Sequence, residues 1–142
     1  MSYELEKSIG FKVNQTANKI NNKYTQLLQS FDIAPEQRAT LEIIKYESDV
    51  NQTKIANILG KDKTTISRTL KTLENKDLIT KSQIDKRTNL IELTKKGEEV
   101  LNDSFSYVKD FRKKLTSKLS EDELNNLITL LEKVAFIVDE EL

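Results

Sequence analysis

Positively charged residues are concentrated in one part of this chain. Ten Lys or Arg and five Asp or Glu lie between Lys61 and Lys96, whereas the whole sequence has 23 basic and 23 acidic residues and no net charge. The remainder of the chain therefore carries a matching negative surplus. A local cationic surface attracts phosphate groups and releases the counterions around them, so this pattern favours nucleic-acid binding.

A run of polar and basic residues inside this segment would line the outer face of a helix. The run comprises Lys63, Thr64, Thr65, Ser67, Arg68 and Lys71. Arg68 is the candidate for base recognition, because a guanidinium group can donate two hydrogen bonds to guanine O6 and N7. The hydroxyl residues would contact thymine methyl groups or phosphates, and the two lysines would contact phosphates. An ordinary solvent-exposed helix face is the alternative interpretation.

A second candidate contact lies at the tip of a predicted hairpin, in Asp85, Lys86 and Arg87. Arg87 would project into the narrow minor groove, where the negative potential is enhanced. Asp85 would orient Arg87 through an ion pair, and Lys86 would add positive charge beside the DNA. A plain surface loop is the alternative for this tip.

Other kinds of site lack the residues that they need. The sequence contains neither Cys nor His, which excludes disulfides, thiol switches and Ser-His or Cys-His nucleophile pairs. Transition-metal sites are disfavoured for the same reason, although carboxylates alone bind hard cations. We therefore expect no enzyme activity, no cofactor and no metal.

Apolar spacing and turn signals predict how the basic face is held. Two helices are expected, from about 52 to 59 and from 63 to about 76, with a turn between them. Ala56 supplies the small residue where the two helices touch, Gly60 ends the first helix in a left-handed conformation, and Ile66 anchors the second. These features are typical of a helix-turn-helix.

Caps and strands complete this central element. Asn51 and Asp62 precede the two helices as N-caps, because their side chains can accept hydrogen bonds from free backbone amides. Short strands at 78–83 and 89–93 then form a charged hairpin. A hairpin directly after a helix-turn-helix predicts a winged arrangement.

Long amphipathic helices flank the central element. One runs from Tyr3 to about Gln29, and a second begins at Pro35 and ends near residue 48. A further helix follows Thr94, and the sequence Ser120-Glu121-Asp122-Glu123 is a capping box that starts another.

The apolar stripes of the first and last helices exceed what the central element can cover. Pairing with a second copy of the chain would bury them, and packing within one chain is the alternative. The expected fold is therefore mainly α, a winged helix-turn-helix DNA-binding domain with long N- and C-terminal dimerisation helices. Residues 1–34 and 97–142 would form the dimerisation helices and residues 35–96 the DNA-binding region, all within one compact unit.

The central residues resemble a known family. The stretch IANILGKDKTTISRTLKTLENKDLI, followed by DKRTNLIELTKKG, is similar to the MarR family of bacterial transcriptional regulators. The resemblance implies a winged-helix homodimer that binds palindromic operators in double-stranded DNA, usually as a repressor relieved by a small anionic or phenolic effector. By position, it assigns DNA contacts to Thr64, Thr65, Ser67 and Arg68, and the wing arginine and its partner to Arg87 and Asp85.

Three departures from the usual family pattern are visible. The first strand and the wing tip are shorter than usual and lack the Pro often found there. Asp77 stands where many members have Gly, a position that requires a left-handed backbone. The absence of Cys and His separates this chain from thiol-oxidation and zinc sensors.

The sequence thus predicts a cytoplasmic, sequence-specific transcriptional regulator without a membrane span. A winged-helix protein-interaction module without specific DNA binding is the alternative. An effector pocket would lie where the long helices meet the winged region, with Lys12, Tyr24, Arg38 and Tyr46 as possible lining residues. Equally, the tyrosines would belong to the core and the charged residues would face solvent.

Overall fold

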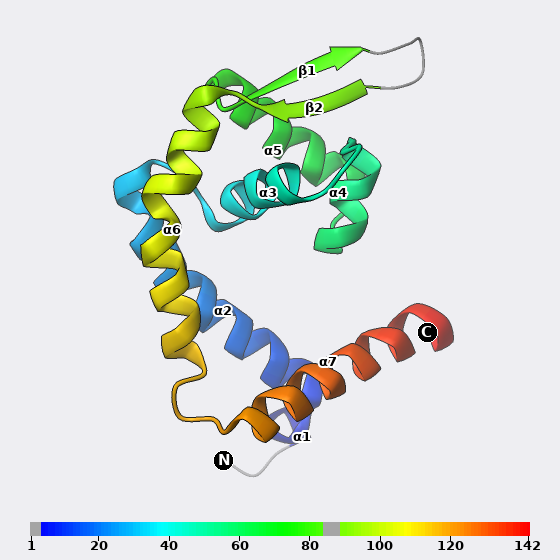
Figure 1. Cartoon of the computed structure of the whole chain (residues 1–142). Coiled ribbons are helices and arrows are strands. Elements are labelled where there is room, and N and C mark those ends of the chain that lie inside the picture. Colours follow the sequence, from blue (N-terminus) through cyan, green and yellow to red (C-terminus); the bar gives the residue numbers. More distant parts are fainter. Residues whose placement is uncertain (1–3, 84–88) are drawn as a thin grey trace. The chain divides into compact units, whose positions relative to one another are not determined.

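The computed structural model describes residues 4–83 and 89–142, and the described chain is mainly helical (Figure 1). It divides into two compact units, Met1–Ser106 and Tyr107–Leu142. The elements in chain order are α1 (Glu4–Lys7), α2 (Ile9–Leu28), the 3₁₀ helix η1 (Gln29–Phe31), α3 (Pro35–Tyr46), α4 (Gln52–Leu59), α5 (Lys63–Asn75), β1 (Ile79–Gln83), β2 (Asn89–Leu93), α6 (Lys95–Leu115) and α7 (Glu121–Glu141).

The N-terminal segment is not the single continuous helix expected from its apolar stripe. Ser8 has an extended backbone conformation, and its side chain accepts a hydrogen bond from the amide of Phe11. Ser8 therefore ends α1 and caps α2, because a serine hydroxyl competes with helical backbone hydrogen bonds. The prediction of one helix was wrong at this residue.

The helix-turn-helix forms as the sequence predicts. The Asn51 side chain accepts a hydrogen bond from the Lys54 amide over 2.8 Å and starts α4. Gly60 ends α4 with φ 65° and ψ 35°. A Cβ at Gly60 would meet no atom within 4 Å, so the left-handed backbone, and not crowding, favours glycine here.

The hairpin packs on the helices through a small apolar core. Strands β1 and β2 pair antiparallel, with Ile79 opposite Leu93 and Gln83 opposite Asn89. The Ile91 amide also donates to the Val50 carbonyl over 3.2 Å, which ties the α3–α4 connection to β2. The buried side chains in this region are Leu41, Ile44, Val50, Ile55, Ala56, Ile66, Leu70, Leu73, Leu78, Ile79 and Ile91.

Two backbone positions join α5, the hairpin and α6. Asp77 has φ 61°, so it adopts the left-handed conformation expected where family members have Gly. Thr94 Oγ1 donates to the Asp77 carbonyl over 2.6 Å. A Cβ at Gly97 would collide with the Leu78 carbonyl oxygen, so only glycine allows the first turn of α6 to approach the residue before β1 this closely.

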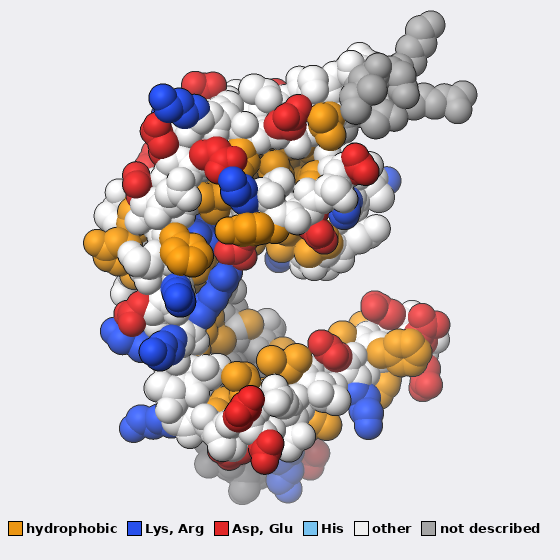
Figure 2. All heavy atoms as spheres, viewed as in Figure 1, with side chains coloured by type: hydrophobic (Ala, Val, Ile, Leu, Met, Phe, Trp, Pro, Cys, Tyr) orange, Lys and Arg blue, Asp and Glu red, His pale blue; other side chains and the backbone are white. Residues whose placement is uncertain are grey.

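The second compact unit leaves much apolar surface exposed. Helix α7 begins at the predicted capping box, in which Ser120 and Glu123 exchange hydrogen bonds. None of its residues is buried, and Figure 2 shows hydrophobic side chains along it. Eight of its large apolar side chains are between 38% and 63% exposed, namely Leu127, Ile128, Leu130, Leu131, Val134, Phe136, Ile137 and Val138.

Candidate nucleic-acid interface

Helix α5 separates an apolar inner face from a polar outer face. Ile66, Leu70 and Leu73 are fully buried and anchor the helix. The outer face comprises Lys63, Thr64, Ser67, Arg68 and Lys71, all of them exposed. Thr65 is half-buried. The structure therefore brings five of the six predicted residues of α5 together on one exposed surface, at the helical spacing that groove insertion requires.

The N-terminus of α5 is capped by a residue beside the basic face. Asp62 Oδ1 accepts a hydrogen bond from the Thr65 amide over 2.7 Å. The pKa of Asp62 is lowered, chiefly by the Thr65 backbone amide, then by the Thr65 side chain and by the nearby charge of Arg68. The cap stabilises the helix end that would enter the groove first.

Replacing Asp62 should weaken the fold in a pH-dependent way. Because the pKa of Asp62 is lowered in the folded protein, its stabilisation is complete above the ordinary aspartate pKa and is lost as pH falls through the folded value. Asp62→Ala should therefore lower the melting temperature at pH 7, with a difference from wild type that shrinks in acid. Thermal unfolding by circular dichroism measures both quantities. Asp62→Asn keeps an acceptor oxygen, so at pH 7 its melting temperature should lie between those of wild type and Asp62→Ala. If the difference in melting temperature between wild type and Asp62→Ala stayed constant down to acid pH, the role of the carboxylate would be contradicted.

Several polar contacts hold α5, and the sequence pattern did not reveal them. Gln52 Nε2 donates to the Lys63 carbonyl over 2.8 Å at the start of the helix. Lys76 Nζ, just beyond its end, donates to the Asp32 carbonyl over 2.7 Å and to Gln37 Oε1 over 3.3 Å. These residues come from distant parts of the chain, so only the folded arrangement identifies them.

The wing-tip residues Asp85, Lys86 and Arg87 lie outside the described residues. Their predicted contacts with the minor groove stay a prediction. The strands that lead to them are described up to Gln83 and from Asn89.

The four residues considered for the lining of an effector pocket have different surroundings. Arg38 is 1% exposed, with Nε donating to Ser104 Oγ over 2.9 Å and a terminal nitrogen donating to Glu42 Oε1 over 3.0 Å. It therefore faces neither solvent nor an open pocket, because its charge is satisfied inside the protein. Tyr46 is 70% exposed, so its assignment to the core was wrong. Lys12 faces solvent, and Tyr24 is half-buried.

A cavity of about 460 Å³ lies beside Tyr24, between α2, α3 and the end of α4. Its lining residues are Asn21, Tyr24, Thr25, Ala34, Pro35, Glu36, Ala39, Leu59 and Lys61. The surface is mostly apolar, and one carboxylate and one ammonium group stand at its wall. This chemistry suits a small amphipathic molecule.

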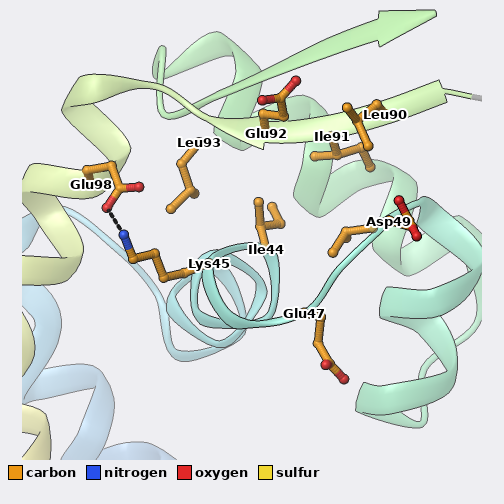
Figure 3. Close-up of a pocket in the computed structure, with 10 residues that line it drawn as sticks. Ile44, Lys45, Glu47, Asp49, Leu90, Ile91, Glu92, Leu93 and Glu98 are labelled. Atoms are coloured by element: carbon orange, nitrogen blue, oxygen red, sulfur yellow. Dashed lines mark hydrogen bonds and ion pairs between the residues drawn. The ribbon is translucent and has the colours of Figure 1, made fainter. Parts of the chain in front are cut away.

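A second hollow, of about 420 Å³, has an acidic rim (Figure 3). Lys45 Nζ and Glu98 Oε2 form an ion pair over 2.8 Å, and this contact raises the pKa of Lys45. Glu47 and Glu92 point in opposite directions from the hollow in Figure 3. Among the described residues no three carboxylates converge as metal ligands, and the negative charge makes this surface unsuitable for phosphate.

Comparison with known proteins decides the family. The regulator MgrA of Staphylococcus aureus, an HTH-type transcriptional regulator, is 31% identical over 97% of this chain and 95% of its own length. Residues 33–88 match the MarR family. The chain belongs to the MarR family. The protein is accordingly a DNA-binding transcriptional regulator and not an enzyme.

Solved structures of the MarR family have the same fold. A MarR/EmrR family regulator from Acinetobacter sp. ADP1 has a TM-score of 0.90 and 31% identity, covering 97% of this chain and 99% of its own. MepR of S. aureus, solved as a complex with DNA, has a TM-score of 0.84 and 26% identity, covering 94% and 98% of the two chains. The predicted fold is confirmed: a mainly helical winged helix-turn-helix with a two-stranded wing and long terminal helices.

Within residues 4–83 and 89–142, none of the helices is both long and apolar enough to cross a bilayer.

Proposed function

We propose that the protein is a homodimeric repressor that binds a palindromic operator and is released by a small-molecule effector. The observation that carries the proposal is the exposed polar face of α5, which presents Arg68 beside Lys63 and Lys71 on a helix anchored by buried side chains. Arg68 would read a guanine, and the lysines would contact phosphates. Asp85, Lys86 and Arg87 would extend the contact into the minor groove.

The dimeric state is supported by the exposed apolar surface of the terminal helices. Helix α7 has no buried residue, and Leu5, Ile9 and Val13 are 49%, 62% and 41% exposed near the N-terminus. Surfaces of this kind are rare on monomers and mark contacts with a partner. Residues 1–34 and 97–142 would pair with a second copy of the chain. In each protomer, residues 35–96 would bind one half-site of the operator.

Release by an effector is supported by the cavity beside Tyr24. An anionic or phenolic molecule would contact the apolar wall and place its oxygen near Lys61, the cation at the edge of the cavity. The protein would act in the cytoplasm, where bacterial DNA lies.

Adding benzoate or phenol to the purified protein–DNA complex tests the proposed effector response, since the effector should release the DNA.

The salt dependence of binding separates this function from a protein-interaction module. A DNA-binding regulator should lose affinity steeply as salt rises and should keep a preference for one sequence at every salt concentration. Fluorescence anisotropy with labelled duplexes measures both. An affinity for DNA without any preferred sequence would favour the interaction module instead.

A further inference from the structure

One carboxylate on α3 holds the middle of α5. Glu36 Oε1 accepts a hydrogen bond from Thr69 Oγ1 over 2.7 Å, although the two residues are 33 positions apart. Thr69 is 9% exposed and follows directly after Arg68 in the helix. A short bond from a hydroxyl to a charged acceptor is among the stronger hydrogen bonds in proteins. The hydrogen bond between Glu36 and Thr69 therefore lies on the inner side of α5, next to the candidate base-reading residue Arg68 in the sequence.

The other oxygen of Glu36 faces the turn of the helix-turn-helix. Lys61 Nζ lies 3.9 Å from Glu36 Oε2, and the lysine side chain is 52% exposed. An exposed pair at this distance contributes little free energy. This pair nevertheless places the carboxylate of Glu36 between the turn and α5. One of its oxygens faces Thr69 on the helix, and the other faces Lys61 in the turn.

Loss of Glu36 would change how α5 is held without leaving a buried polar group unsatisfied. Thr69 Oγ1 also lies 3.2 Å from the Thr65 carbonyl, one turn earlier in the same helix. The hydroxyl would then donate to Thr65 alone. Helix α5 would stay helical, and its buried residues would keep it on the core, but the polar tie to α3 would be gone.

We propose that Glu36 is a positioning residue for DNA recognition, which fixes the orientation of α5 and thereby sets the preference for operator over other DNA. The proposal rests on the proposed function in one respect, that α5 is the helix that reads bases. Base contacts depend on side-chain geometry, whereas contacts with phosphate depend mainly on charge. A small rotation of α5 would therefore reduce specific binding and leave non-specific binding almost unchanged.

The sign of the effect distinguishes positioning from charge. Removing a carboxylate from a DNA-binding unit should, by charge alone, strengthen binding to every DNA. Glu36→Ala should instead lower operator affinity, reducing the ratio of operator to random-duplex affinity on the order of tenfold. Glu47→Ala is the matched control, because it removes an exposed carboxylate from the other end of α3. The proposal would be overturned if Glu36→Ala behaved like Glu47→Ala, with each variant strengthening binding to the operator and to the random duplex by the same factor.

Two further variants isolate the hydrogen bond. Thr69→Val removes the hydrogen-bond donor at nearly constant volume. It should reduce the ratio of operator to random-duplex affinity as much as Glu36→Ala does, and the double variant Glu36→Ala/Thr69→Val should show no further loss. Glu36→Gln keeps an acceptor oxygen for Thr69 and should retain most of the wild-type preference for operator over random duplex. An unchanged ratio in Thr69→Val would contradict the role of this bond.

A measurement without DNA separates this proposal from the proposed function. Residual dipolar couplings of the α5 amides, compared with those of α3, report the orientation of the recognition helix in the free protein. They should change in Glu36→Ala and stay constant in Glu47→Ala. Unchanged couplings in Glu36→Ala would refute the positioning role even if the wild type showed no preferred DNA sequence.

Discussion

Arg68→Ala should abolish most of the sequence preference of this protein while leaving its fold intact. The side chain is exposed on α5 and contributes nothing to the buried core, so the variant should melt close to the wild-type temperature. A bidentate contact between arginine and guanine provides about 1–3 kcal/mol of discrimination, which corresponds to roughly a fivefold to 150-fold loss of operator affinity for each half-site. A gel-shift titration with operator and scrambled duplexes measures the loss.

Two control variants separate base reading from charge. Arg112→Ala removes an equal charge from an exposed position on α6 and should leave operator preference unchanged. Lys71→Ala should weaken binding to operator and scrambled duplexes alike, with a salt slope that falls by about one for each half-site. If Arg68→Ala weakened both duplexes equally, Arg68 would be a phosphate contact, and the assignment of the base-reading residue would be wrong.

Placing negative charge on the apolar face of α7 should separate the dimer. Leu131 and Val134 lie on this face and are 44% and 38% exposed in the single chain. In the double variant Leu131→Glu/Val134→Glu, the carboxylates would be buried unpaired at the interface, which costs several kcal/mol per group. Sedimentation velocity should then find a monomer. Operator affinity should fall at least about a hundredfold, because a palindrome is bound tightly only when both half-sites are occupied by linked domains.

The control variant introduces one glutamate on the opposite side of the helix. Thr129 lies on the opposite side of α7 from Leu131 and Val134 at helical spacing, so Thr129→Glu should stay dimeric with unchanged operator affinity. A Leu131→Glu/Val134→Glu protein that remained a dimer at low concentration would show that α7 does not form the dimer contact.

Local signals in the sequence predicted the DNA-binding element because each depends on neighbouring residues. Asn51, Gly60 and Asp62 occupy the expected cap positions, since capping involves only the first or last turn of a helix. Asp77 adopts the left-handed conformation that its place in the family pattern requires. The outer and inner faces of α5 followed from helical periodicity in the same way.

Long-range contacts were not predictable from the pattern. Arg38 was expected to face solvent or a ligand, yet Ser104 accepts its hydrogen bond from 66 residues away. Glu36 is an acidic residue in the first turn of α3, where the helix dipole favours a carboxylate whatever its long-range contacts. Its contact with Thr69 depends on how α3 crosses α5, a packing detail that periodicity does not encode. Ser8 was missed for a different reason, because an uninterrupted apolar stripe outweighed a single weak capping residue.

Selection of bound sequences from a random pool of double-stranded DNA tests the central claim most directly. A dimer that presents two copies of α5 should enrich a palindrome whose half-site centres lie about 10 base pairs apart, close to one helical turn. The same selection with Arg68→Ala should lose the enriched base at one position in each half-site. A pool that stayed random after selection by the folded wild-type protein would contradict sequence-specific operator binding by this chain.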